Sequence, residues 1–275
     1  MNSTRFSVNM CVYHGDSSMA FDKAIDSVVN QTRRPSELVL VVDGPIGDEL
    51  EGVLNKWACL GPDFFRVVRL KKNQGLGNAR RIALANTRYE IVAIMDADDI
   101  CVANRFELQI NYMDKHPEIS VLGGNIVEFD AMTGKDLSCK IMPENDIDIK
   151  KYLKKRNPIN NMTVMARKKD ILAAGGFQDY YLMEDYYLWA RMCIHGMKFH
   201  NLQEILVNVR GGRDMFNRRG GWKLFCSEYS MQKFLLGSKI ISYDTFIFNV
   251  IIRFIIEVLC PSKLRGLLYK MFARN

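Results

Sequence analysis

The first 117 residues alternate short apolar runs with segments of helical periodicity. The runs are FSVNMCVY (6–13), ELVLVVDG (37–44), FFRVVRL (64–70) and YEIVAIMDADD (89–99). Runs of this length, rich in branched apolar residues, are typical of strands buried on both faces of a parallel sheet, and the helical segments between them cover those faces. The alternation therefore predicts an α/β fold built on a single Rossmann-like, mostly parallel sheet with helices on both faces.

Two of these runs end in carboxylates: Asp43 closes one, and Asp96, Asp98 and Asp99 close another. In open α/β sheets, ligands bind beyond the carboxyl ends of the strands. Crowded carboxylates raise each other's pKa, so they need either Lys and Arg neighbours or a hard divalent cation. As an alternative, Asp98 or Asp99 caps the helix that begins near Asn104. A cap needs one carboxylate only, so the pattern favours a site for Mg²⁺ or Mn²⁺ together with a phosphate group.

Composition limits the partners and the compartment. The chain has 275 residues and a net charge of +7, which suits nucleic acid, a phosphorylated small molecule or an anionic membrane surface. Its basic clusters are split among several segments without a nucleic-acid-binding module, so we expect no nucleic acid partner. The seven cysteines form no CxxC pair, and the N-terminus has no apolar run long enough for a signal peptide. Both observations indicate the cytoplasm.

The tail from about residue 242 is apolar with a narrow polar stripe. In DTFIFNVIIRFIIEVLC (244–260), Asn249, Arg253 and Glu257 recur every four residues, which argues against a membrane-spanning segment. A basic amphipathic segment, SKLRGLLYKMFARN (262–275), follows. This combination predicts helices that lie on an anionic leaflet; the alternative is that they pack on the main domain.

Five segments, in order, resemble the inverting glycosyltransferases of family 2, which use nucleotide-sugars and have the GT-A fold. They are SVNMCVYHGD (7–16), AIDSVVNQTRRPSELVLVVDG (24–44), KKNQGLGNARRIAL (71–84), MDADD (95–99) as an Asp-x-Asp motif, and GGF (175–177) followed by MEDYYLWARM (183–192). The resemblance implies a GT-A domain over residues 1–222, with a nucleotide-binding half of about 1–117 and an acceptor-side half of about 118–222. Residues 223–275 would form a C-terminal helical, membrane-associating extension.

The resemblance also implies roles on the donor side. Asp43 would contact the nucleotide base, although VVDGP lacks the second carboxylate that the family usually carries there. Arg80 lies in a segment that faces the donor, and Asp96 would hold the ribose or belong to the metal shell. Asp98 would be the main ligand of Mn²⁺ or Mg²⁺, with Asp99 beside it.

On the acceptor side, the resemblance makes Asp185 the catalytic base. Transfer with inversion needs a base for the acceptor hydroxyl, and desolvation beside aromatic residues raises a carboxylate's pKa toward that use, whereas a helix N-terminus lowers it. As an alternative, Glu184 and Asp185 merely charge the first helical turn. Gly175 and Gly176 would form a tight turn close to the donor sugar. Trp222, in RRGGW, resembles an element that covers the acceptor in processive relatives, at a different spacing.

We therefore expect a metal-dependent inverting glycosyltransferase that moves a sugar from a UDP-sugar to a hydroxyl of a lipid-linked (polyprenyl diphosphate) glycan of bacterial surface polysaccharide. It would work in the cytoplasm, peripheral at the inner face of the cell membrane. One alternative is a nucleotidyltransferase of related topology, but YHGDSS lacks the Gly-rich phosphate loop that it would need. The other is a non-enzymatic membrane-surface module, which would leave the carboxylates without a purpose.

Overall fold

The computed structural model describes residues 4–211 and 220–260. Its strands are β1 (Phe6–Val12), β2 (Glu37–Val42), β3 (Phe65–Arg69), β4 (Ile91–Asp96), β5 (Ile100–Cys101), β6 (Ile119–Asp130), β7 (Asp136–Lys140), β8 (Met165–Arg167) and β9 (Lys198–Gly211). The α-helices are α1 (Ser18–Val29), α2 (Asp48–Trp57), α3 (Leu76–Asn86), α4 (Arg105–Lys115), α5 (Asp146–Leu153), α6 (Lys168–Ala173), α7 (Glu184–Ile194), α9 (Trp222–Gly237) and α10 (Tyr243–Phe254). Shorter turns lie at Ala58–Leu60 and Asn161–Thr163, and a π-helical turn, Ile255–Leu259, continues α10.

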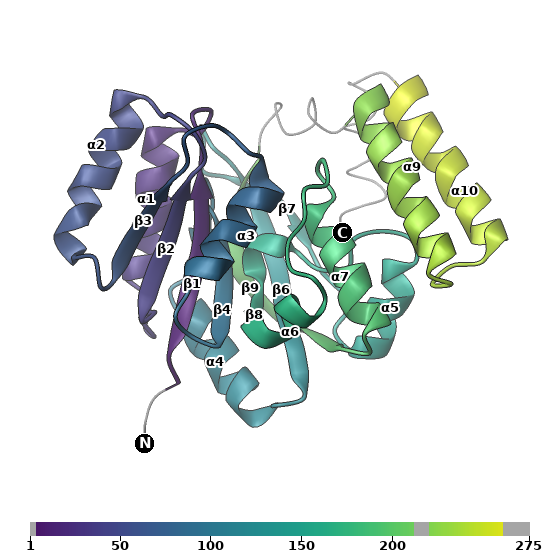
Figure 1. The fold of residues 1–275 in the computed structure, drawn as a ribbon, viewed down its shortest axis with the longest axis horizontal. Coiled ribbons are helices and arrows are strands. Elements are labelled where there is room, and N and C mark those ends of the chain that lie inside the picture. Colours follow the sequence, from purple (N-terminus) through teal and green to yellow (C-terminus); the bar gives the residue numbers. More distant parts are fainter. Residues whose placement is uncertain (1–3, 212–219, 261–275) are drawn as a thin grey trace.

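The strands form one curled sheet in the order β3-β2-β1-β4-β8-β6-β9-β5, with β7 paired to β6 (Figure 1). The strands β3, β2, β1 and β4 are parallel, as the alternation in the sequence predicted. β8 then pairs antiparallel with both β4 and β6. The predicted α/β architecture with a mostly parallel sheet is confirmed, and the antiparallel pairs are those that β7, β8 and β9 make with β4, β5 and β6.

Helices cover both faces of the sheet because alternate strand residues point to opposite sides. In β2, Leu38 and Leu40 belong to the core that also includes Phe21 of α1, whereas Val39 and Val41 pack with α3. A second large cluster joins the sheet to α5, α6, α7 and α9. The two faces of the sheet are therefore both buried, which explains why the first strands are almost entirely apolar.

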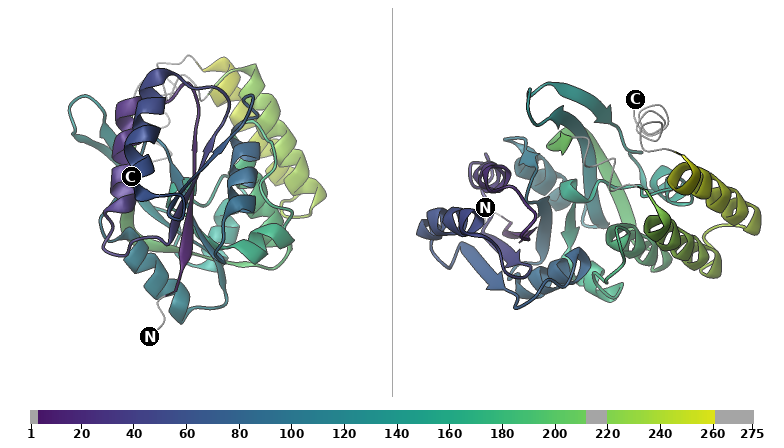
Figure 2. Two further views of the ribbon diagram at one scale, coloured as in Figure 1. Left: turned by 60° about the vertical axis from the view of Figure 1, so that its left-hand side comes forward. Right: turned by 90° about the horizontal axis from the view of Figure 1, so that it is seen from above.

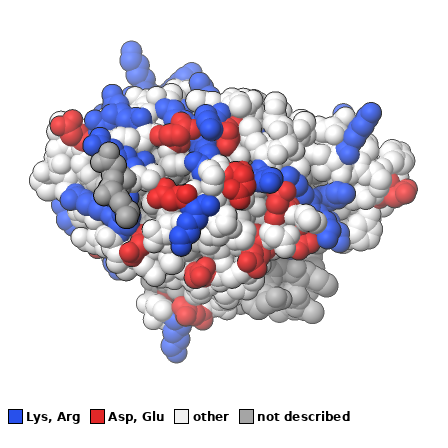
Figure 3. Space-filling view, turned by 90° about the horizontal axis from the view of Figure 1, so that it is seen from below, with Lys and Arg blue, Asp and Glu red and all other residues white. Residues whose placement is uncertain are grey.

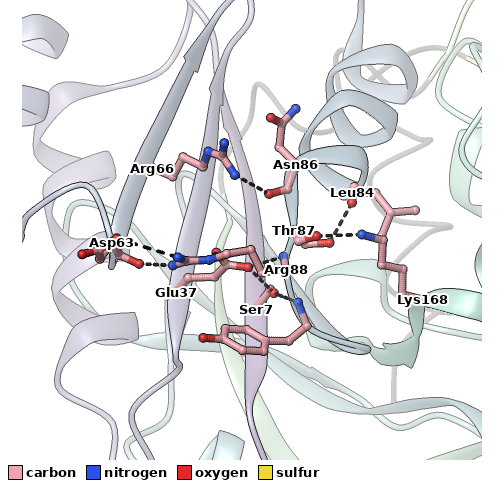
Figure 4. Close-up of polar contacts among 10 residues, drawn as sticks. Ser7, Glu37, Asp63, Arg66, Leu84, Asn86, Thr87, Arg88 and Lys168 are labelled. Carbon is pink, nitrogen blue, oxygen red and sulfur yellow. Dashed lines mark hydrogen bonds and ion pairs between the residues drawn. The ribbon is translucent and has the colours of Figure 1, made fainter.

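The amino ends of the parallel strands are held by an ion pair between buried Glu37 and the partly exposed Arg88 (Figure 4). Glu37 is fully buried and accepts hydrogen bonds from Ser7 Oγ at 2.6 Å, from the Arg88 backbone N at 2.6 Å and from Arg88 Nε at 2.7 Å. A buried charge is tolerated when it is paired and its oxygens are hydrogen-bonded. This network fixes the starts of β1, β2 and β4, at the edge opposite to Asp43 and Asp96.

The helices α9 and α10 lie side by side at one end of the molecule, with α10 outermost (Figures 1 and 2). Tyr187 of α7 contacts Phe234 of α9 with ring centroids 4.7 Å apart, so α9 packs on the main body. None of the helices in the described part of the chain is long and apolar enough to cross a bilayer. The predicted basic segment 262–275 lies outside the described residues.

The positive net charge is not gathered into a single patch on the face seen from below. Lys and Arg side chains are interspersed there with Asp and Glu side chains (Figure 3). A nucleic-acid-binding face is usually a continuous basic surface that tracks the phosphate backbone. This face does not have that character.

Candidate active site

Asp43 organises the turn that leads into α3. It lies at the end of β2 and is buried; one carboxylate oxygen accepts from the Gln74 backbone N at 2.7 Å and the other from the Gly75 backbone N at 3.0 Å. Gly75 has φ +85°, a left-handed conformation that glycine adopts without steric cost. Asp43 therefore holds the start of α3 at the carboxyl edge of the sheet. Its contact with a nucleotide base stays a prediction.

Arg80 lies one turn into α3 and is fully buried, with an ion pair from Nη2 to Asp96 at the end of β4. Its Nε and Nη1 have no hydrogen-bond partner within the described residues. Burial opposes the guanidinium charge, but the charges of Asp96, Glu184 and Asp185 raise the pKa of Arg80 above its ordinary value. Arg80 thus connects the donor-side carboxylate electrostatically with those of α7. Direct contact with the donor stays a prediction.

The three carboxylates after β4 are not equivalent. Asp99 is buried, and its Oδ1 accepts from the Arg210 backbone N of β9 at 2.9 Å. Burial and the charges of Asp98 and Asp96 raise the pKa of Asp99 well above its ordinary value. Arg210 Nε also donates to the Asp98 carbonyl oxygen at 3.1 Å. Asp99 therefore ties this turn to β9, whereas Asp96 and Asp98 remain half-buried.

Asp96 and Asp98 are the half-buried carboxylates beside which a divalent cation is predicted, and Asp96 is also ion-paired with Arg80. Mg²⁺ is usually held by one or two carboxylates, with water and substrate phosphate oxygens completing its coordination. Across residues 4–211 and 220–260, no three His, Cys, Asp or Glu side chains converge into a complete metal site. Asp98 as the main ligand and Asp99 beside it stay predictions.

The start of α7 carries the predicted base. One oxygen of Asp185 accepts from Asn157 Nδ2 at 2.7 Å, and the other accepts from the Tyr186 backbone N at 2.7 Å. Desolvation raises the pKa of Asp185, while these two hydrogen bonds and the charge of Arg80 lower it. Burial and the neighbouring Asp185 raise the pKa of Glu184. The two hydrogen bonds favour the ionised form of Asp185, and its role as the catalytic base stays a prediction.

Glycines allow α3 to lie close to the loop before α7. A Cβ at Gly77 in α3 would collide with the Gln178 carbonyl oxygen, so only glycine allows this close approach of helix and loop. The loop is reached through Gly175 and Gly176, whose φ values are +86° and +66°. Arg191 of α7 donates from Nη2 to the Gly176 carbonyl oxygen at 2.7 Å. The predicted tight turn exists; its proximity to a donor sugar stays a prediction.

Trp222 opens α9 and is 63% exposed, with its ring 5.5 Å from that of Phe225. Its predicted place on the acceptor side is not tested by these contacts. Asn157 is a residue that sequence reasoning missed, because it lies in a stretch that showed only polar and basic character. Its neighbour Pro158 marks a turn but carries no functional signal.

Residues 7–176 match the family model described as Glycosyl transferase family 2. A relative from Erwinia amylovora, the amylovoran biosynthesis glycosyltransferase AmsE, is 39% identical over 85% of this chain and 86% of that protein. An Escherichia coli relative is named UDP-Gal:alpha-D-GlcNAc-diphosphoundecaprenol beta-1,3-galactosyltransferase. It is 34% identical over 100% of this chain and 98% of its own length.

Two solved structures share the fold. Staphylococcus aureus TarS 1–349 in complex with UDP-GlcNAc matches with a TM-score of 0.67 and 16% identity, over 92% of this chain and 73% of that one. The mannosyltransferase PcManGT of Pyrobaculum calidifontis, in complex with GDP-Man and Mn²⁺, matches with a TM-score of 0.61 and 14% identity, over 97% and 79%. At these identities the likeness extends to the fold alone, and it confirms the predicted GT-A architecture.

Proposed function

Since the chain belongs to glycosyltransferase family 2, we propose that it moves a sugar from a UDP-sugar to a hydroxyl of a lipid diphosphate-linked glycan in surface polysaccharide assembly. Family membership makes the chain an inverting glycosyltransferase and decides against the nucleotidyltransferase and the non-enzymatic membrane module. The donor and acceptor classes rest on the relative named for UDP-Gal and a diphosphoundecaprenol acceptor, which matches the whole chain. The neighbour in complex with UDP-GlcNAc supports a UDP-sugar as well.

The observation that carries the proposal is the packing of α3 against α7, which brings the Arg80–Asp96 ion pair to the side of the sheet where Asp185 begins α7. One carboxylate lies at the donor edge of the sheet and the other at the start of α7. In the reaction, the acceptor oxygen attacks the anomeric carbon while Asp185 takes its proton, and the bond from that carbon to the diphosphate breaks. UDP leaves with the electron pair of that bond. Asp185 accepts hydrogen bonds on both oxygens, so it is oriented before the substrate arrives.

The donor is held along the carboxyl ends of β2 and β4. Asp43 lies nearest the base, Asp96 holds the ribose or the metal shell, and Arg80 supplies positive charge beneath the diphosphate. Asp98, with Asp99 behind it, would hold Mn²⁺ or Mg²⁺. That ion would stabilise the charge that develops on the departing diphosphate. The Mn²⁺ of one structural neighbour supports this part of the proposal.

The acceptor is held by the second half of the chain. The turn at Gly175 and Gly176 approaches the donor sugar, and Glu184 and Trp222 lie on the acceptor side. Residues 1–222 form the catalytic domain, and 223–275 form an extension that meets an anionic membrane surface. The enzyme is peripheral at the cytoplasmic face of the cell membrane, because a polyprenyl diphosphate acceptor is anchored there.

Donor binding tests this function directly. A ligand that binds only the folded state raises its stability with the logarithm of concentration over Kd. We expect UDP and UDP-sugars with Mn²⁺ to raise the Tm, GDP and CMP to raise it less, and Asp98→Ala to remove the metal-dependent part. A protein whose Tm responds to no nucleotide under any metal would refute the donor assignment.

A further inference from the structure

We propose that the outer face of α10 and its π-helical continuation docks on the interface of an anionic lipid bilayer. The inference deepens the proposed function, because an enzyme with a lipid-linked acceptor must reach that acceptor at a membrane. Its basis is separate, because it rests on the orientation of the side chains of one helix. This helix buries its polar side chains and exposes its apolar ones.

The polar stripe of this helix faces inward. Asn249 Nδ2 donates to Gln232 Oε1 of α9 at 2.8 Å and to the Lys154 carbonyl oxygen, beyond α5, at 2.9 Å. Arg253 Nη1 lies 3.1 Å from Glu228 Oε1 of α9 and 3.7 Å from Glu257 Oε1. Asn249, Glu228 and Glu257 are all buried. The polar residues that interrupt the apolar tail therefore attach α10 to α9 and to the main body of the protein.

The apolar side chains face outward. Phe248 is 61% exposed, Ile251 52% and Ile255 48%. The full outer face consists of Tyr243, Ile247, Phe248, Ile251, Ile252, Ile255 and Leu259. Their spacing of three and four residues puts them on one side of the helix. A surface helix of a water-soluble protein normally has the opposite orientation, and a contiguous exposed apolar face marks an interaction site.

An apolar hollow adjoins this face, between α9 and α10. It has a volume of about 440 Å³ and is lined by Trp222, Phe225, Cys226, Tyr229, Ser230 and Val250. Trp and Tyr side chains favour the boundary between lipid headgroups and acyl chains. The aromatic side chains that line the hollow would therefore lie at this boundary when α10 lies in the bilayer interface.

The surrounding charges favour anionic lipid as the occupant. On α9 and in the turn after it, Lys223, Lys233 and Lys239 are exposed, whereas Asp244 is the single exposed acid on α9 and α10. Lys side chains near an anionic leaflet are attracted to its headgroups. The charge near this face is therefore mostly basic, which suits a bilayer that carries anionic headgroups over its whole surface.

Vesicle flotation of the full chain tests the proposal. We expect the protein to float with phosphatidylcholine vesicles that contain phosphatidylglycerol, and much less with phosphatidylcholine alone. The double substitution Ile251→Glu and Ile255→Glu should lower the bound fraction at least tenfold. The matched control, Met132→Glu with Ile147→Glu, changes two other exposed apolar residues, 96% and 67% exposed, and should float like the wild type.

The outcomes separate this inference from the proposed function. Unchanged flotation of the Ile251/Ile255 variant, or no flotation of the wild type, would overturn the docking face. So would a wild-type dimer in light scattering that this variant dissolves. The milder substitution Ile251→Ser and Tm measurements of each variant control for misfolding. If the Ile251/Ile255 variant loses much of its Tm and the wild type does not float, the face is covered by the chain itself. The Ile251/Ile255 variant and the Met132/Ile147 control should both retain transfer to a water-soluble acceptor analogue. A wild-type protein that floats but shows no transfer would refute only the transferase proposal.

Discussion

Asn157 Nδ2 lies 2.7 Å from a carboxylate oxygen of Asp185, and this contact joins two residues that are 28 positions apart in the chain. A side-chain amide that donates to a carboxylate favours its ionised form. Desolvation raises the pKa of Asp185, the proposed base, and this donor acts in the opposite direction and lowers it. We regard Asn157 as a positioning residue, since it acts through Asp185.

The first prediction concerns the pH dependence of transfer. A base works when it is ionised, so kcat/KM rises as the pH rises through the pKa of Asp185. Asn157→Asp replaces the donor with a second carboxylate, which raises that pKa and moves the acid limb of the profile to higher pH by about one unit or more. Asn55→Asp, at an exposed position of α2, should leave the profile unchanged. An unshifted limb in Asn157→Asp would contradict the role of this contact.

The second prediction concerns Asp185 itself. Asp185→Asn keeps the size of the side chain but removes proton acceptance, so kcat should fall by about 10²- to 10⁴-fold. Donor binding, measured as the Tm increase with UDP and Mn²⁺, should stay close to that of the wild type. Asp63→Asn, at a fully exposed position, serves as the control. Transfer by Asp185→Asn at the wild-type rate would remove this residue from the chemistry.

The third prediction concerns the buried pair of Arg80 and Asp96. Arg80→Met leaves Asp96 without its partner, and removal of one member of a buried pair costs about 3–5 kcal/mol. For Arg80 and Asp96, the loss in unfolding free energy should lie at or below the lower end of this range, because the Asp96 side chain is 28% exposed to water. Adding Asp96→Asn to Arg80→Met should recover part of the loss in urea unfolding. Strictly additive losses in the double variant would mean that the two side chains do not depend on each other.

The fourth prediction concerns stability against pH. The folded-state pKa of Asp99 is raised by burial and by Asp98 and Asp96, so its contribution to stability is complete below the unfolded pKa of about 4 and is lost as pH rises through the folded pKa. Asp99→Asn removes this loss and should raise the Tm of the metal-free protein at pH 7 by a few degrees. At pH 4 the wild type and the variant should have the same Tm. A lower Tm of the variant at pH 7 would contradict the assigned cause.

The sequence predicted best the features that depend on residues close together in the chain, such as strands and their ends. The apolar runs around Val39 and Ile94 predicted buried parallel strands, since residues on both faces of those strands must be apolar. Asp43 and Asp96 were placed at the carboxyl edge because parallel strands end together. The contact of Asn157 with Asp185 could not be predicted, because it depends on how the chain between them folds back.

The tail shows the same distinction. The repeat of Asn249, Arg253 and Glu257 predicted a polar stripe correctly, but the sequence could not tell which way the stripe faces. That depends on partners in other elements, such as Gln232 and Glu228. Likewise, three adjacent carboxylates suggested one cluster, and tertiary contacts turned Asp99 toward Arg210 instead.

The contact at Gly77 has a consequence for engineering substrate range. There the backbone of α3 touches the backbone of the loop near Gln178, so no side chain is available for trimming. A side chain at residue 77 would therefore push α3 away from this loop. Arg80 follows less than one turn later, so such a substitution should also disturb the ion pair of Arg80 with Asp96. A library that seeks new sugars should keep residue 77 as glycine and vary the surrounding loops.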